Sequence, residues 1–89
     1  MPSTTAVVGS TSGLHARPAS VLAQAAAATG AKVTIEKEGK PAANAASILG
    51  LLALGINHGE TVTLSVEGDD ADAHLATLTA LITSNLDEA

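Results

Sequence analysis

The 89-residue sequence contains no cysteine and no phenylalanine, tyrosine or tryptophan. The absence of cysteine excludes thiol catalysis, disulfide bridges and cysteine-bound zinc or iron–sulfur centres. No aromatic side chain is therefore available to stack on nucleic-acid bases. With four basic residues against nine acidic ones, the chain also lacks the basic stripe that a phosphate backbone requires. We therefore expect no nucleic-acid partner.

Long apolar runs are also missing. The longest, from Ile48 to Ile56, has nine residues and includes two glycines, whereas a membrane-spanning helix needs about 20. A signal peptide would begin with a basic stretch followed by an apolar segment, and the N-terminus does not have this pattern. We therefore expect no membrane insertion and a cytoplasmic location.

The residues that are present favour a folded domain. Hydrophobic residues make up 46% of the chain and charged residues 15%, a balance typical of globules rather than disordered tails. The length suits one domain and not two, so we expect a single domain over residues 1–89. Nineteen positions are alanine, so the core must be built from Val, Ile, Leu and Ala.

Three segments alternate apolar and polar residues in the manner of strands with one buried face: residues 4–8, 32–37 and 61–66. A brief further strand is expected around Ala42 and Ala43. Three other segments carry apolar residues at helical spacing. The first has Pro18 in its first turn and stops at Gly30.

The second helix is expected to start after an N-cap at Ser47 and to end by Gly55. The third follows the turn at residues 68–70, whose Asp69 and Asp70 are interpreted as capping residues. Its inward stripe is Ala71, Leu75, Leu78 and Ile82. The order βαββαβα predicts an α+β open-faced sandwich, a four-stranded antiparallel sheet with three helices on one face.

Charge is distributed unevenly along the chain. Residues 1–31 contain no acid, and their only charged side chain is Arg17, the single arginine of the sequence. The three lysines fall between residues 32 and 40, and seven acids follow from Glu60 onward. An anion would therefore meet the least repulsion near Arg17.

His15 lies directly before the first predicted helix and two residues before Arg17. Helix N-termini expose unpaired N–H groups and a partial positive charge, which favours anions. Pro18 has no N–H, so the donors near His15 are chiefly those of Ala16 and Arg17. A phosphoryl group on the imidazole would lie over them, and Arg17 could add a charge-assisted contact. The same dipole favours a neutral, nucleophilic imidazole.

Spacing alone leaves another interpretation open. A lone histidine between a loop and a helix is more often a surface residue or an incidental cap. The residue before a proline also tends to avoid helical geometry, so Arg17 could be strained or lie outside the helix.

The residues themselves are more specific. Gly13-Leu14-His15-Ala16-Arg17-Pro18-Ala19 resembles the active-site signature of HPr, the histidine-containing phosphocarrier family of the bacterial sugar phosphotransferase system. A second block, residues 44–55, resembles the family's serine-containing segment and short helix. The resemblance covers essentially the whole chain.

The resemblance implies a carrier rather than an independent enzyme. His15 would accept a phosphoryl group on Nδ1 from a phosphohistidine of enzyme I, itself charged by phosphoenolpyruvate. It would pass the group to a histidine on an enzyme IIA domain for sugar uptake, and Arg17 would help to hold and release the phosphate. Two imidazoles flanking one phosphorus need no metal or cofactor. We expect a monomer that meets these enzymes and, in some cases, regulatory proteins.

The short second helix is apolar on every side, yet a helix on a sheet buries only one stripe. We assign Leu51 and Leu54 to the core and Ile48, Leu49 and Leu52 to a docking patch, which agrees with the family's use of this helix. The alternative is that all five belong to the core.

Ser47 has two interpretations. It is an ordinary N-cap, and the resemblance also implies regulatory phosphorylation, because in some relatives a dedicated kinase modifies the matching serine and the added charge obstructs docking. Ala46 departs from the basic residue that many relatives carry at that position.

The remaining candidates are weaker. His58 falls in a predicted turn and His74 is expected to face solvent, so we assign neither to a metal site. Two functions of other classes stay open beside the carrier: a regulatory HPr-like paralogue that signals through protein binding, and a hydrolase that uses His15. Hydrolysis would need a general base near His15, and residues 1–31 contain no carboxylate.

Overall fold

A computed structural model of the chain describes residues 2–9, 13–14 and 16–84. Within these residues the elements follow the predicted order βαββαβα. The strands are β1 (Ser3–Val7), β2 (Lys32–Lys37), β3 (Ala43–Asn44) and β4 (Thr61–Glu67). The helices are α1 (Ala16–Ala28), α2 (Ile48–Leu54) and α3 (Ala71–Thr83).

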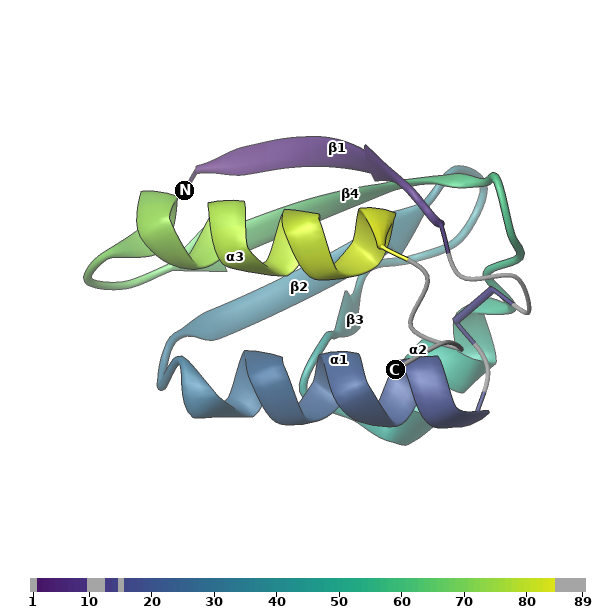
Figure 1. The fold of residues 1–89 in the computed structure, drawn as a ribbon, viewed down its shortest axis with the longest axis horizontal. Helices are drawn as coiled ribbons and strands as arrows, with labels where there is room; N and C mark the ends of the chain where they lie inside the picture. The colour runs from purple at the N-terminus through teal and green to yellow at the C-terminus, as the bar shows by residue number, and fades with distance from the viewer. Residues whose placement is uncertain (1, 10–12, 15, 85–89) are drawn as a thin grey trace.

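The four strands form one antiparallel sheet in the order β1-β4-β2-β3. The helices cover one face of it, and α1 and α3 run across that face side by side (Figure 1). Helix α3 packs on β1 and β4, whereas α2 packs on β2 and β3. The predicted open-faced sandwich is therefore confirmed.

The core lies between the sheet and the helices. Alternation along β2 and β4 directs every second side chain toward the helices, and the register places Ile35 opposite Leu64. The apolar stripe predicted for α3 is buried against this layer. The largest fully buried side chains are only Val, Ile and Leu: Leu14, Leu22, Ile35, Leu51, Ile56, Leu64, Leu78, Ile82, Val8, Val33, Val62 and Val66.

Two predicted strands are displaced by one residue. β1 ends at Val7 rather than Val8, although Val8 is buried and its N–H still donates to the Glu60 carbonyl at 3.0 Å. The short third strand pairs through Ala43 and Asn44 instead of Ala42 and Ala43. Pro41, which has no N–H to give to a ladder, stands just before this segment.

The capping role predicted at the start of α3 is confirmed for Asp70 in its position only, and that of Asp69 stays a prediction. Asp70 occupies the N-cap position of α3, but its side chain makes no capping hydrogen bond. It lies in the left-handed region at φ 58°, a conformation that the short polar side chain of Asp tolerates better than most. The residue therefore serves the backbone of the turn rather than the helix N–H groups.

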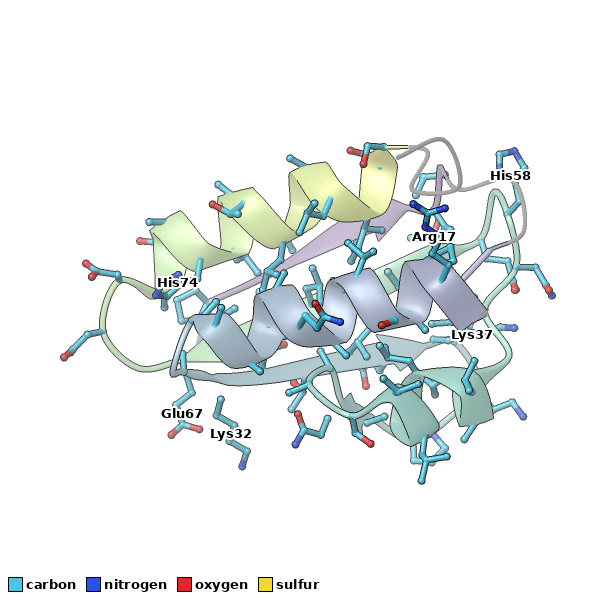
Figure 2. All side chains as sticks on the ribbon, turned by 60° about the horizontal axis from the view of Figure 1, so that its bottom comes forward. Arg17, Lys32, Lys37, His58, Glu67 and His74 are labelled. Carbon is cyan, nitrogen blue, oxygen red and sulfur yellow. The ribbon has the colours of Figure 1, made fainter. Side chains whose placement is uncertain are left out.

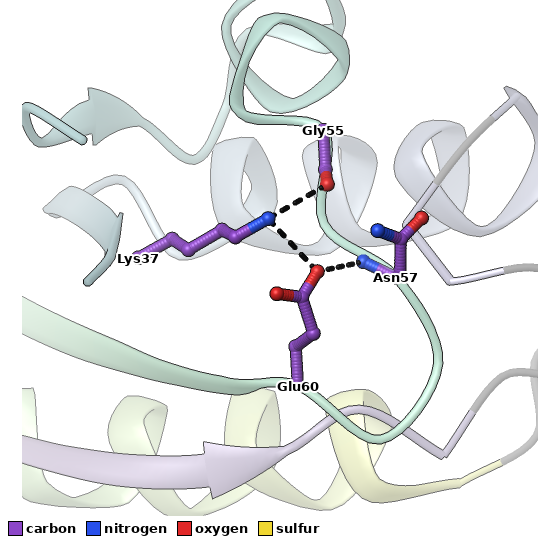
Figure 3. Close-up of polar contacts among 4 residues, drawn as sticks. All are labelled: Lys37, Gly55, Asn57 and Glu60. Atoms are coloured by element: carbon purple, nitrogen blue, oxygen red, sulfur yellow. Dashed lines mark hydrogen bonds and ion pairs between the residues drawn. The ribbon is translucent and has the colours of Figure 1, made fainter. Parts of the chain in front are cut away.

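One polar network joins three parts of the fold (Figure 3). Lys37, at the end of β2, donates from Nζ to the Gly55 carbonyl at 3.0 Å and to Glu60 Oε1 at 2.9 Å. The same Glu60 oxygen accepts from the Asn57 N–H at 2.7 Å. The network thereby ties β2 to the end of α2 and to the segment that leads into β4.

These contacts change the acidity of Glu60. The hydrogen bond from Lys37 and then the one from the Asn57 N–H hold the pKa of Glu60 below its ordinary value of 4.5. A carboxyl group with a lowered pKa in the folded state stabilises the fold at pH values above its unfolded-state pKa. That stabilisation is lost as the pH falls through the lowered pKa.

We therefore expect wild type to be more stable than Glu60→Gln at neutral pH, and the difference to shrink as the pH falls below 4.5. Protonated Glu60 and glutamine are both neutral, which is why the curves converge. Urea unfolding from about pH 7 to about pH 3 measures this difference. Glu67→Gln, an exposed carboxylate at the other end of β4, is the matched control. A stability difference for Glu60→Gln that does not change with pH would contradict this assignment.

Candidate functional site

The segment that leads into α1 is held against the residues that follow α2. The Leu14 N–H donates to the Ile56 carbonyl at 3.0 Å, and both side chains are fully buried. Gly13 approaches the same segment so closely that a Cβ on it would lie 2.7 Å from the Asn57 Cα. Its φ of +73° also favours glycine. The motif glycine is therefore required by this close approach.

The chain that leaves β1 is fixed as well. The Gly9 N–H donates to the carbonyl of Ile82 near the end of α3, at 2.9 Å. The Gly59 N–H donates to the Val8 carbonyl at 2.9 Å. The backbone on either side of residues 10–12 is thus anchored, by α3 on one side and by the segment after α2 on the other.

His15 lies outside the described residues, so its role stays a prediction. Its neighbours in sequence are placed: Leu14 is buried, and α1 begins at Ala16. Ala16 and Arg17 are the first two residues of the helix, and N–H groups in that position have no acceptor within the helix. The first turn contains no acidic residue, which leaves the positive end of the helix dipole unopposed within that turn.

Arg17 lies inside α1 and not outside it, so that alternative from the sequence is wrong. Pro18 is the third helical residue, where its missing N–H costs no helical hydrogen bond. The helix can therefore include both residues. The Arg17 side chain is exposed, and it lies at the N-terminal end of α1 (Figure 2). On the two sides of residue 15 in the sequence motif, Leu14 is therefore buried and Arg17 is exposed.

The division of α2 into a buried and an exposed side is confirmed. Leu51 and Leu54 are 0% and 4% exposed. Ile48, Leu49 and Leu52 are 42%, 80% and 38% exposed, and we call these three residues the α2 patch. Among the described residues only one other large hydrophobic side chain, Val7 on β1, is comparably exposed.

The predicted caps of α2 are also present. Ser47 Oγ accepts from the Gly50 N–H at 3.1 Å, so the N-cap prediction is confirmed. Gly55 ends the helix in the left-handed conformation at φ 62°. The next residue, Ile56, carries the carbonyl that holds Leu14. Helix α2, which carries the α2 patch, and the start of α1 are therefore joined through a short stretch of backbone, and Figure 1 shows the two helix ends on the same side of the molecule.

The sequence did not identify the network of Lys37, Asn57 and Glu60. One signal was available: Lys37 falls on the inward face of its strand, two residues after buried Ile35. A charged residue at an inward position needs a partner. The partner could not be named from the sequence, because Glu60 is 23 residues away.

The other histidines lie apart from each other. His58 is exposed in a turn at the same end as Arg17, and His74 lies at the opposite end (Figure 2). His74 is half-buried rather than solvent-facing as expected. In the described part of the chain no three His, Cys, Asp or Glu side chains gather as metal ligands. None of the helices described there has the length and apolarity that a bilayer crossing demands.

Comparison with known proteins places the chain in a family. The family model described as "PTS HPr component phosphorylation site" matches residues 2–84. The chain is 46% identical over 81 residues to phosphocarrier protein HPr of Streptomyces coelicolor, covering 91% of this chain and 87% of that one. It is 48% identical over 77 residues to phosphocarrier protein NPr of Shewanella violacea, covering 86% and 84%.

A solved structure agrees with these sequence matches. The crystal structure of HPr-C-His from Thermoanaerobacter tengcongensis superimposes with a TM-score of 0.91 at 38% identity. The superposition covers 100% of this chain and 99% of that one. The motif around residue 15, the open-faced sandwich and the matched sequences all point the same way, and the chain belongs to the HPr family of phosphocarrier proteins.

Proposed function

We propose that this phosphocarrier accepts a phosphoryl group on Nδ1 of His15 from phospho-enzyme I and donates it to enzyme IIA domains for sugar uptake. The observation that carries the proposal is the start of α1 at Ala16, directly after His15, in a turn without acidic residues. The phosphoryl group would meet the N–H groups of Ala16 and Arg17, whose orientation the helix fixes before the phosphate arrives.

The transfer step is a displacement at phosphorus. The lone pair of Nδ1 in neutral His15 attacks while the bond from phosphorus to the donor's histidine nitrogen breaks, so the group passes between two imidazoles. No general base is needed, because a neutral imidazole with its proton on Nε2 already has a free lone pair on Nδ1. The dipole of α1 favours this uncharged form. Arg17 adds a positive charge that helps to hold the transferred group and to release it to the acceptor.

The α2 patch is the proposed docking surface for both partners. It consists of three exposed apolar side chains on a helix with no charged residue. Its helix leads directly into Gly55 and Ile56, the backbone that supports Leu14. A partner that covers the patch would therefore bring its own histidine to the end of the molecule where α1 begins.

The remaining features of the proposal follow from the carrier role. The chain acts as a single domain over residues 1–89 and as a monomer in the cytoplasm. It gains its phosphoryl group from one partner and loses it only to another. His15, Ala16 and Arg17 supply the site, so no metal or other cofactor enters the step.

A regulatory HPr-like protein is the second candidate function, favoured by the 44% identity over 70 residues to HPr-like protein Crh of Halalkalibacterium halodurans. Such a protein would act through binding to its targets rather than through sugar transport. His15 and Arg17 are both present here, although a relative that has abandoned phosphotransfer would be expected to lack the histidine. Phosphate delivery to an enzyme IIA domain of a sugar transporter separates the two candidates.

Ser47 is a proposed site of regulatory phosphorylation. Its side chain caps α2, and it directly precedes Ile48 of the α2 patch. A phosphoryl group there would place negative charge beside the proposed docking surface, and charge that must be desolvated weakens an apolar contact. Incubation with an HPr-directed serine kinase, followed by intact-mass measurement of wild type and Ser47→Ala, distinguishes this role from capping alone.

The carrier proposal predicts a phosphohistidine at one position. Wild type incubated with phosphoenolpyruvate and enzyme I should gain one phosphoryl group, stable in base and labile in acid, and His15→Ala should gain none. His58→Ala and His74→Ala, which remove exposed and half-buried histidines elsewhere, should be labelled like wild type. Intact-mass measurement gives the number of phosphoryl groups on each of the four proteins. Labelling of His15→Ala would refute the assignment, and steady release of inorganic phosphate by wild type would indicate a hydrolase instead.

The docking proposal predicts that Leu49→Asp impairs phosphorylation without unfolding the chain. Leu49 is 80% exposed, so the fold should tolerate the charge, whereas an apolar interface should lose about tenfold or more in kcat/KM with enzyme I. Val7→Asp is the matched control, because Val7 is 52% exposed on β1 and receives the same change of charge. Thermal unfolding checks both variants. Equal kinetics for the two would contradict the patch, and loss of folding in Leu49→Asp would assign that residue to the core.

A further inference from the structure

Lys37 and Glu60 form hydrogen bonds with the backbone on either side of Ile56 (Figure 3). The Lys37 ammonium holds the carbonyl of Gly55, the residue before Ile56, at 3.0 Å. The Glu60 carboxylate holds the N–H of Asn57, the residue after it, at 2.7 Å. The two side chains are themselves joined at 2.9 Å. The peptide groups that flank Ile56 are therefore fixed from β2 and from the start of β4.

Ile56 in turn carries the segment that precedes His15. Its carbonyl accepts from the Leu14 N–H at 3.0 Å, and Gly13 packs against Asn57 without room for a Cβ. Any rotation of the 55–57 backbone would therefore shift Leu14. Since α1 begins at Ala16, two residues after Leu14, such a shift would act on the backbone that leads into the helix.

The ion pair is partly shielded from water. The Lys37 side chain is 18% exposed and that of Glu60 31%. Fully exposed ion pairs contribute little because water and salt screen them and because both side chains lose freedom. Here the ammonium and the carboxylate each have a second, backbone partner, which fixes their geometry. The pair can therefore fix the orientation of the backbone at residues 55–57, which an isolated surface ion pair would not do.

We infer that Lys37 and Glu60 are positioning residues for phosphoryl transfer: through Ile56 they hold Leu14, and with it the backbone that leads into α1, in the geometry that transfer requires. The inference rests on the proposed function of His15. Neither residue is assigned a contact with the phosphoryl group. In-line transfer between two imidazoles depends strongly on geometry, and misplacement by about 1 Å can cost on the order of 100-fold in rate.

The same two strands offer a matched control. Lys32 and Glu67 are cross-strand partners at the opposite end of β2 and β4, and Figure 2 shows them far from Arg17. Lys37→Met and Lys32→Met each remove one of the four basic residues, so the change in net charge is identical. Glu60→Ala and Glu67→Ala form the corresponding acidic pair.

The experiment compares these four variants with wild type in phosphorylation by enzyme I and in amide hydrogen exchange. We expect Lys37→Met and Glu60→Ala to lower kcat between roughly 10- and 100-fold with KM unchanged, because the α2 patch is intact. Exchange at the Leu14 N–H should accelerate, while exchange in the core of the sheet, at Leu64, stays at the wild-type rate. The Lys32 and Glu67 variants should match wild type in every measurement.

Conservative variants separate positioning from general stability. Lys37→Arg keeps a donor fork able to bond two acceptors and should recover part of kcat. Glu60→Gln keeps an acceptor for the Asn57 N–H and should fall between wild type and Glu60→Ala. If Lys37→Met fails to fold, Glu60→Gln and Glu60→Ala decide the question.

Two results would overturn the inference while leaving the carrier function intact. One is a wild-type kcat in folded Lys37→Met and Glu60→Ala. The other is a lowered kcat with wild-type exchange at the Leu14 N–H, which would show that the pair does not act through Leu14. If wild type itself accepts no phosphoryl group, the proposed function fails, and the positioning role falls with it.

Discussion

The hydrogen bond from the Leu14 N–H to the Ile56 carbonyl holds the candidate site together. Both residues are fully buried, and a buried peptide group without its partner costs about 1–3 kcal/mol. Water cannot reach either group to replace this hydrogen bond, so breaking it would leave both groups without a partner. It connects the residue before His15 to the backbone after α2, so the start of α1 and the α2 patch occupy fixed positions relative to each other. The proposed docking of a phosphoryl donor and then of an acceptor requires that fixed relation.

The site is assembled from backbone more than from side chains. Gly13 permits the close approach to Asn57, Pro18 occupies a first-turn position where no N–H is needed, and Gly55 turns the chain out of α2. These three residues allow two segments distant in sequence to meet in close contact. The N–H groups of a helix start, which cannot rotate away, suit a group that must be bound briefly and passed on.

Much of this arrangement could be predicted from local patterns. Alternation identified the strand at residues 61–66, and the excess of apolar residues in α2 correctly separated buried Leu51 and Leu54 from the exposed patch. The cap at Ser47 was predictable because only the adjacent helix is involved. For His15, spacing alone left two interpretations open, and the resemblance of residues 13–19 to the HPr signature favoured one of them; His15 itself lies outside the described residues.

The remaining features depend on tertiary context. The partnership of Lys37 with Glu60 requires the register of β2 on β4, which no local pattern specifies. Asp70 looked like a side-chain cap but serves the backbone in a left-handed turn, a difference that residue type alone does not reveal. Arg17 entered the helix despite the proline after it, because the first turn has no hydrogen bond for Pro18 to break. In each case packing or register, rather than propensity, decided the outcome.

In the proposed carrier, the start of α1 receives the phosphoryl group of His15 on the N–H groups of Ala16 and Arg17. The most direct measurement is the amide proton chemical shift of these two residues in ¹⁵N-labelled protein, before and after phosphorylation by enzyme I. We expect both protons to move strongly downfield with formation of the phosphohistidine, and to return when the group passes to an enzyme IIA domain. A phosphohistidine at His15 that leaves these two amides no more shifted than that of Val66, in the core of the sheet, would contradict the claim.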